Sequence, residues 1–484
     1  MVDPGARFGG CRVAAQLSQL ARDTHSRANV AMAEMGHMLP FNEPVALVER
    51  RAKASSGAGP YCGGAWGAGT APLVIPDDPT AVDMGGDDDG AADLMRTTAV
   101  RTAALFAALL GLAAAGCSHA SDGQKRPAAT RTASPRAAAA PAGLPGMPPL
   151  LDPRDVYAAD RPNRLSPVVK DFPSRVYVPN SNSGTVSVID PKKYKVIRTI
   201  PVGDQPQHVV PSWDLKTLWV NNNRGHTLTP IDPATGKAGK PVDVHDPYNL
   251  YFTPNGKYAI VMASLDRELV FRDPHTMKVR KTVPVSCYGV NHADFSADGR
   301  YFIVSCEFSG ELLKVDTEKM KVIGQQRLPF EGAMPQDVKI SPDGSTWYVA
   351  DMMAHGVWVL DGDKFTEPRL LRTGRGAHGL YVSRDSTWMY ITNRGEGTVS
   401  VLDFRTGELD RKWRLPGGGS PDMGGVSSDG KVLWLSGRYD SEVYAIDTRN
   451  GELLARIPVG GGPHGLAVYP QPGRYSLGHT GVFR

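Results

Sequence analysis

From about residue 171 onward, apolar and polar residues alternate in short runs that are rich in β-branched side chains. Alternation with a period of two is typical of β-strands that bury one face. Many runs are separated by turn dipeptides whose glycine takes a positive φ angle without steric cost. These dipeptides are Asn255-Gly256, Asp298-Gly299, Asp343-Gly344 and Asp429-Gly430. The pattern predicts an all-β structure of antiparallel strands.

The runs recur with a period of roughly 40 residues, which indicates a repeat architecture. One unit consists of segments 175–180, 184–190 and 196–203. Four short antiparallel strands per unit, repeated around an axis, form the blades of a β-propeller. The same order of segments returns twice later in the chain, at 388–393, 397–403 and 413–416 and at 433–436, 442–447 and 455–460.

The number of innermost strands gives the number of blades. The first unit, from Arg175, lacks an innermost strand, and the last run, 465–468, has no complete blade after it. The simplest closure uses the last run to complete the first blade, which also removes exposed sheet edges. We therefore predict a seven-bladed β-propeller over residues 166–470. The expected innermost strands lie near Val209, Leu250, Ala293, Val338, Leu380, Gly424 and Leu466.

The residues before the repeat differ in composition and are expected to serve export. Residues 1–94 show no persistent hydrophobic period, and we interpret them as a disordered extension or as absent from a native protein that starts at Met95. Residues 95–117 combine a basic start, a short apolar stretch and small residues before Cys117. This is the pattern of a secretory signal peptide, and its end resembles a bacterial lipobox, whose cysteine is lipidated. We expect an extracytoplasmic lipoprotein anchored to the membrane through Cys117.

Two further segments flank the predicted propeller. Residues 118–165 are rich in alanine and proline and are interpreted as a flexible linker between anchor and folded domain. Residues 471–484 follow the closing strand as a tail that either seals the first blade or reaches a partner.

Charge and motif content exclude several function classes. The chain has 54 Lys and Arg residues against 50 Asp and Glu, a net charge of +4, and so lacks the basic surplus of nucleic-acid-binding proteins. It contains no GxxxxGK[ST], HExxH or GxSxG motif, which leaves phosphoryl transfer and serine-hydrolase chemistry by those motifs unsupported. Because there is no CxxCH, a covalent c-type haem is excluded.

We expect the protein to be a monomer.

The repeat units resemble the YVTN-type β-propeller repeat. Its signature strand appears here as Tyr177-Val-Pro-Asn180 and Tyr390-Ile-Thr-Asn393, and the resemblance covers residues 171–470. It implies the propeller fold. Members of this family include surface and binding proteins, lactonases and the d-type haem domain of cytochrome nitrite reductases, so the resemblance leaves the function open.

Polar residues stand at the expected starts of all seven innermost strands. Strands alternate in direction within a blade. The starts of the innermost strands therefore lie at the same end of the central channel as the turns between the second and third strands. We call this end of the propeller the top face. Convergent polar groups at a concave opening predict a binding site, and arginines suit an anionic group. The candidate residues are His208, Asn249, His292, Asp337, His378, Asp422 and His464 from the strand starts and Arg224, Arg394 and Arg438 from the turns.

Three functions fit this arrangement. The first is binding of a small ligand or a protein partner at the top face. The second is a lactonase-type hydrolase, with His378 or His464 as general base and Arg394 or Arg438 stabilising the oxyanion. The third is binding of a non-covalent haem or a transition metal, since imidazole is a common ligand of both. The first asks least of the sequence and is preferred. Whether the protein is catalytic, and whether it holds a cofactor, stays open at this point.

Cys287 and Cys306 fall in the fourth blade near the top face, and three interpretations remain open. They form a disulfide, which suits an exported protein. Alternatively, Cys306 and His292 hold a soft metal together with a nearby methionine. The third interpretation is two separate small buried side chains.

Overall fold

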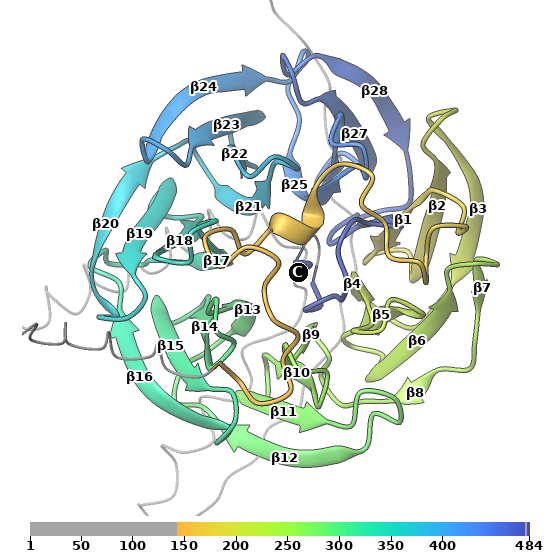
Figure 1. Ribbon diagram of the computed structural model, residues 1–484. Helices are drawn as coiled ribbons and strands as arrows, with labels where there is room; N and C mark the ends of the chain where they lie inside the picture. The colour runs from red at the N-terminus through yellow and green to blue at the C-terminus, as the bar shows by residue number, and fades with distance from the viewer. Residues whose placement is uncertain (1–142, 480–481) are drawn as a thin grey trace, which may run out of the picture. The chain divides into compact units, whose positions relative to one another are not determined.

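The computed structural model describes residues 143–479 and 482–484, which form a seven-bladed β-propeller with one short 3-10 helix, η1 (Ala158–Asp160) (Figure 1). The predicted fold class is thereby confirmed. Residues 1–94, the signal-like segment and Cys117 lie outside the described residues. No helix in the described part of the chain has the length and apolar character needed to cross a membrane.

The first blade is completed by the end of the chain, as predicted. The C-terminal strand β29 pairs antiparallel with β1, in the register Tyr177↔Ala467. The second blade differs from the others because its outer edge is split into two short strands. The first blade contains β29 (Ala467–Tyr469), β1 (Arg175–Asn180), β2 (Thr185–Asp190) and β3 (Lys195–Pro201), and the second contains β4 (Pro206–Pro211), β5 (Leu218–Asn222), β6 (Thr227–Asp232), β7 (Lys237–Ala238) and β8 (Val242–Asp243).

The remaining five blades are regular four-stranded antiparallel sheets in chain order. Blade 3 contains β9 (Asn249–Phe252), β10 (Ala259–Ala263), β11 (Glu268–Arg272) and β12 (Val279–Pro284), and blade 4 contains β13 (Val290–Phe295), β14 (Tyr301–Cys306), β15 (Glu311–Asp316) and β16 (Lys321–Arg327). Blade 5 contains β17 (Pro335–Ile340), β18 (Thr346–Asp351), β19 (Gly356–Asp361) and β20 (Thr366–Arg372). Blade 6 contains β21 (Ala377–Val382), β22 (Trp388–Asn393), β23 (Thr398–Asp403) and β24 (Glu408–Arg414), and blade 7 contains β25 (Pro421–Val426), β26 (Val432–Gly437), β27 (Glu442–Asp447) and β28 (Leu453–Pro458).

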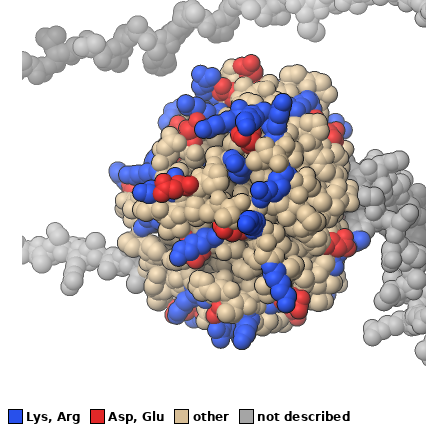
Figure 2. All heavy atoms as spheres, turned by 90° about the vertical axis from the view of Figure 1, so that its right-hand side faces the viewer, with Lys and Arg blue, Asp and Glu red and all other residues tan. Residues whose placement is uncertain are grey.

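Burial decreases from the axis to the rim of each blade. Every residue of β13 is buried, whereas the outermost strand of the same blade, β16, alternates between exposed and half-buried residues. The apolar residues between blades form one core cluster for each pair of neighbouring blades, for example around Phe271 and Phe302 between blades 3 and 4. On the side of the outer wall that Figure 2 shows, Lys and Arg side chains are interspersed with Asp and Glu. Hydrophobic contact between blades therefore holds the ring together.

Residues 143–174 cross the face opposite the top face, which we call the floor (Figure 1). The backbone N–H groups of Leu144, Val156 and Asn163 donate to carbonyls in the first hairpin turns of blades 4, 5 and 7. Tyr157 is buried, and its hydroxyl donates to the carbonyl of Ile340 at 2.8 Å. The described part of the predicted linker 118–165 is thus packed on the propeller, which composition alone did not indicate.

Candidate ligand site in the central channel

An irregular register at the innermost strand starts turns the candidate side chains into the channel. In β13 the pairing passes from Val290↔Cys306 to Ala293↔Val304, which leaves one extra residue on the inner strand at Asn291 and His292. Such a β-bulge bends the strand and re-aims its side chains. The innermost strands β4, β17, β21 and β25 carry the same irregularity beside their own candidate residues.

Five histidines pack against one another inside the channel. Four of them, His208, His292, His378 and His464, come from the predicted strand starts, and the fifth, His479, comes from the C-terminal tail. The ring centroid of His208 lies 4.9 Å from that of His464 and 5.0 Å from that of His479. The ring of His292 lies 4.9 Å from that of His479 and 6.1 Å from that of His378. All five side chains are buried.

Burial keeps these imidazoles neutral. It lowers the pKa of His208 to about 3, and it holds the pKa values of the other four well below their ordinary value. The charges of Arg394 and Arg438 lower the pKa values of His378 and His464 further. A neutral imidazole has one N–H and one lone pair, so each ring is able both to donate and to accept, or to coordinate a metal.

Asp422 lies at the centre of an upper group of polar side chains near the top face. Its Oδ1 is 3.1 Å from both Nδ1 of His378 and Nη1 of Arg394, and its Oδ2 is 3.5 Å from Nε2 of His464. Burial raises the pKa of Asp422, while the positive charges of Arg394 and Arg438 oppose that rise. The upper group is defined by His378, Asp422, His464, Arg394 and Arg438.

Arg438 differs from Arg394 in its partners. Its Nη1 donates to the Ser181 hydroxyl at 2.7 Å and to the Gly462 carbonyl at 3.1 Å, both of which are neutral. Among the described residues it forms no ion pair at 4.0 Å or less. Half-buried at the mouth of the channel, this guanidinium keeps a charge that no neighbouring carboxylate balances by direct contact.

Three other candidate residues have different surroundings. Asp337 accepts the backbone N–H of Val338 and that of Leu380 on the next blade, each at 3.0 Å, so it ties blades 5 and 6 together. Asn249 is buried and lies against His479. Arg224 is exposed on the β5–β6 turn of blade 2, whereas Arg394 and Arg438 come from turns of blades 6 and 7.

The geometry of the fold and the channel agrees with one known family. A family model described as a YNCE-like β-propeller matches residues 164–472. The chain belongs to the YNCE-like β-propeller family. The predicted resemblance to YVTN-type propellers is thereby confirmed for the fold and the repeat.

Relatives of this YNCE-like propeller include both sequences and solved structures. The uncharacterized protein YncE of Salmonella typhi is 23% identical over 274 residues, which span 53% of this chain and 76% of YncE. Protein NirF of Pseudomonas aeruginosa is 34% identical over 104 residues, but these span only 21% of this chain and 26% of NirF. Hydrazine synthase of Kuenenia stuttgartiensis superposes with a TM-score of 0.50 at 18% identity, covering 58% of this chain and 98% of that chain, and shows the fold alone. These relatives favour neither the hydrolase nor the haem alternative.

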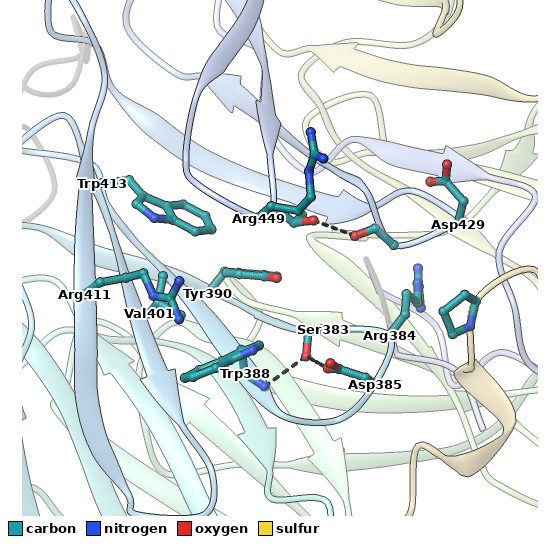
Figure 3. A pocket seen from close by; sticks show the side chains of 13 residues that line it. Ser383, Arg384, Asp385, Trp388, Tyr390, Val401, Arg411, Trp413, Asp429 and Arg449 are labelled. Atoms are coloured by element: carbon teal, nitrogen blue, oxygen red, sulfur yellow. Dashed lines mark hydrogen bonds between the residues drawn. The ribbon is translucent and has the colours of Figure 1, made fainter.

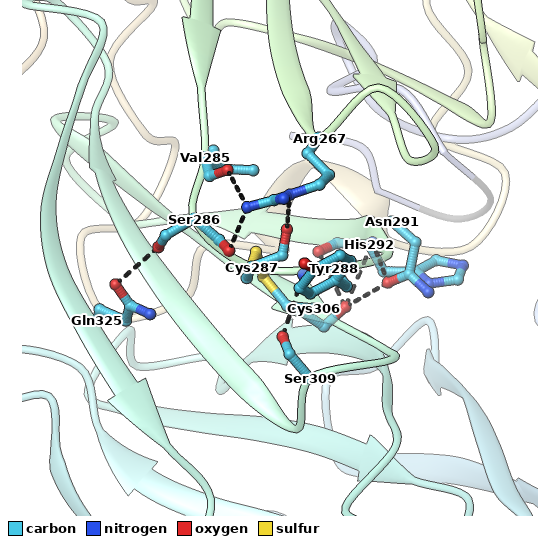
Figure 4. The surroundings of a disulfide bond; sticks show 11 residues. Arg267, Val285, Ser286, Cys287, Tyr288, Asn291, His292, Cys306, Ser309 and Gln325 are labelled. Carbon is cyan, nitrogen blue, oxygen red and sulfur yellow. Dashed lines mark hydrogen bonds between the residues drawn. A yellow bond between two sulfur atoms is a disulfide. The ribbon is translucent and has the colours of Figure 1, made fainter. Parts of the chain in front are cut away.

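Cys287 and Cys306 form a disulfide in this YNCE-like propeller, with their Cα atoms 6.0 Å apart (Figure 4). The bond ties the connector after β12 to the end of β14. Arg267 secures the same connector by donating to the carbonyls of Ser286 at 2.7 Å and Cys287 at 3.2 Å. No thiolate is left at Cys306 for the metal site considered with His292. The disulfide instead fixes the segment that leads into the bulge carrying His292.

A pocket of about 270 Å³ lies between blades 6 and 7, outside the channel (Figure 3). Its aromatic lining is provided by Trp388, Tyr390 and Trp413, with the guanidinium of Arg411 stacked 4.8 Å from the Trp388 ring. It contains none of the candidate residues. The pocket is therefore separate from the candidate site in the channel.

The C-terminal tail closes the channel floor. Arg484 is buried, its Nη2 lies 3.1 Å from Oδ1 of the fully buried Asp294, and its guanidinium lies over the ring of Tyr157. His479 reaches upward from the same tail to the other histidines. His479 was not predicted as a site residue, because the C-terminal tail lies outside the repeat units from which the strand starts were identified. The sequence signal that was available is a histidine in the tail that follows the closing strand.

Asp160, in η1 on the floor, gives a pH-dependent prediction. Its Oδ2 is 3.9 Å from Nη1 of Arg384, and its Oδ1 has no partner in the described structure. Burial raises its pKa from an ordinary 3.8 to about 7, against the opposing charge of Arg384. Its contribution to stability is fully present below pH 3.8 and is lost as the pH rises to about 7, by roughly 1.4 kcal/mol per pH unit.

We therefore expect the stability of the wild type, relative to Asp160→Asn, to fall between pH 4 and pH 7 and then level off. Denaturant unfolding of both proteins at several pH values measures this difference. A difference that is the same at pH 5 and pH 7.5 would contradict the burial of an ionisable carboxyl at this position.

Proposed function

We propose that this YNCE-like propeller is an exported, lipid-anchored binding module that holds a small anionic ligand, or an anionic group of a protein partner, at the top of its channel. Export and anchoring are supported by the signal-like sequence that ends in Cys117. The ligand site is supported by the upper group, in which the charged side chains of blades 6 and 7 lie near the neutral imidazoles of His378 and His464.

The proposal that the ligand is an anion rests on how the charged side chains are paired at the top of the channel. The buried Glu307 acts electrostatically on both guanidinium groups, of Arg394 and Arg438, and burial raises its pKa. The carboxylate of the upper group that lies near the two guanidinium groups is that of Asp422. Only Arg394 contacts that carboxylate. A buried or half-buried charge without a charged partner is unfavourable, and an anion that binds Arg438 would remove this penalty. Guanidinium groups bind carboxylates and phosphates in a two-pronged geometry, which makes these the expected ligand groups.

A thermal-shift and calorimetric screen tests this function. The probes are acetate, succinate, inorganic phosphate and sulfate, at fixed ionic strength. We expect at least one of them to raise the melting temperature and to bind with a stoichiometry of one per chain. Arg438→Gln is expected to weaken that binding about tenfold or more, as the loss of one charge-assisted hydrogen bond of about 1.5 kcal/mol implies.

Arg449→Gln is the matched control, because Arg449 is an exposed arginine paired with Asp447 on blade 7, at 2.7 Å. It is expected to leave anion binding unchanged. If no anion binds, or if both variants weaken binding equally, the proposed site at the top of the channel is wrong.

A further inference from the structure

Next to the upper group, three imidazoles from separate parts of the chain meet in the channel, with the His208 ring centroid 4.9 Å from that of His464. His208 comes from β4, His292 from β13 and His479 from the C-terminal tail, and all three are fully buried. Each offers one ring nitrogen such that the three nitrogens lie within 4.8 Å of one another. We call these three residues the lower histidine cluster.

The hydrogen bond made by His208 fixes which of its nitrogens carries the lone pair. Its Nδ1 is 2.8 Å from the backbone carbonyl oxygen of Tyr248, which can only accept, so Nδ1 carries the hydrogen and donates. The lone pair is therefore on Nε2, a buried atom with no partner in the described structure. A metal-bound histidine is characteristically held in this way, with its second nitrogen donating to a carbonyl or carboxylate.

The other two rings also present a lone pair. The Nδ2 atom of Asn249, a hydrogen-bond donor, lies 3.1 Å from Nδ1 of His479. The carboxylate of Asp337 lies 3.8 Å from the other ring nitrogen of His479, Nε2. Both neighbours favour the form of His479 with the hydrogen on Nε2 and the lone pair on Nδ1. A metal bound at Nδ1 would displace the Asn249 amide from that lone pair. His292 has no hydrogen-bond partner at either ring nitrogen in the described structure.

Buried polar groups in folded proteins are almost always hydrogen-bonded, so an imidazole with two unpartnered nitrogens calls for a ligand. The local charges favour a cation in the lower histidine cluster rather than in the upper group. The upper group contains the positive charges of Arg394 and Arg438, whereas the carboxylate of Asp337 lies beside His479. Lys339 places a positive charge near His292 and His479, which opposes a cation there. The carboxylate of Asp337, which interacts with Lys339 and lies 3.8 Å from Nε2 of His479, offsets that charge.

We propose that the lower histidine cluster, His208, His292 and His479, binds one divalent transition-metal ion of the zinc or copper class. Neutral imidazole is a preferred ligand of these ions, and three histidines leave a fourth coordination position open. Because one ligand belongs to the tail, the site is complete only when the tail is docked in the channel, which couples metal binding to folding. The proposal does not depend on the anion site above it.

The test is a metal titration of the full chain after chelator treatment, with Zn²⁺ as the probe and Co²⁺ as its spectroscopic substitute. We expect one Zn²⁺ per chain, a higher melting temperature on Zn²⁺ addition, and visible Co²⁺ absorption bands typical of histidine ligation. His292→Ala and His479→Ala are each expected to weaken Zn²⁺ binding by about 100-fold or more, since even the loss of outer-shell partners costs 10–100-fold.

His245→Ala is the matched control. His245 is exposed, bonded to Asp266 at 2.6 Å and stacked on His226, so it represents adventitious surface binding. The proposal predicts that this variant keeps full Zn²⁺ affinity. It is overturned if the wild type binds no stoichiometric Zn²⁺ or Co²⁺, if His292→Ala binds as tightly as the wild type, or if only His245→Ala loses binding. Should a channel variant fail to fold by circular dichroism, the wild-type stoichiometry and Co²⁺ spectrum decide the matter alone.

Discussion

Replacement of Arg484 by alanine is expected to lower the free energy of unfolding by about 3–5 kcal/mol. The substitution removes the cation that lies 3.1 Å from Asp294, and both side chains are almost completely shielded from solvent. Asp294 would keep its hydrogen bonds from the backbone N–H groups of Phe295 and Ile340 but would lose its charged partner. Denaturant unfolding of the two proteins measures the change.

The matched control for this variant is Arg449→Ala. Its ion pair with Asp447 is similar in length, but the Arg449 side chain is 80% exposed. A pair of this kind contributes at most about 1 kcal/mol because water and salt screen it. If Arg484→Ala cost no more than Arg449→Ala, the tail would not be docked on the floor in solution.

Tyr469→Ala is expected to destabilise the propeller by about 3–5 kcal/mol, the usual cost of deleting a buried aromatic ring. Tyr469 ends the closing strand β29, is 1% exposed and packs in the core cluster between blades 1 and 2 with Tyr177 and Val209. Its hydroxyl also donates to the carbonyl of Leu215. Thermal and denaturant unfolding would both show the loss.

Tyr288→Ala serves as the control for the loss of a tyrosine ring. Tyr288 is 55% exposed, and its main contact is the guanidinium of Arg267 at 4.2 Å from the ring centroid. We expect an effect of about 1 kcal/mol or less. Equal effects at both positions would mean that the closing strand contributes little to holding the ring together.

The sequence predicted the propeller well because each blade repeats the same alternation and the same turn dipeptides. The closure by β29 followed from a missing strand at one end and a surplus strand at the other. The candidate residues at the strand starts were found by the same alignment, and the structure brings His208, His292, His378, Asp422 and His464 together in the channel.

The remainder could not be predicted from a repeat. The turn that carries Arg224 follows the pattern of the turns with Arg394 and Arg438, but it belongs to blade 2, whereas Asp422 lies in blade 7. The positive charges that act on Asp422 come from Arg394 and Arg438. Asp337 resembles a ligand residue in sequence but is used to join neighbouring blades. The floor is built by segments outside the repeat, so its partners Tyr157, Asp294 and Arg484 were visible only in the structure.

The pairing of β29 with β1 has a consequence for the order of events during synthesis and folding. Blade 1 is the first blade to emerge, but its inner strand is supplied by residues 467–469 near the end of the chain. Until these residues arrive, β1 has an unpaired edge that other strands can join, and contacts of such long sequence separation form slowly. A chaperone or a holding factor acting on the nascent chain would therefore have most effect in the interval before the last blade is finished.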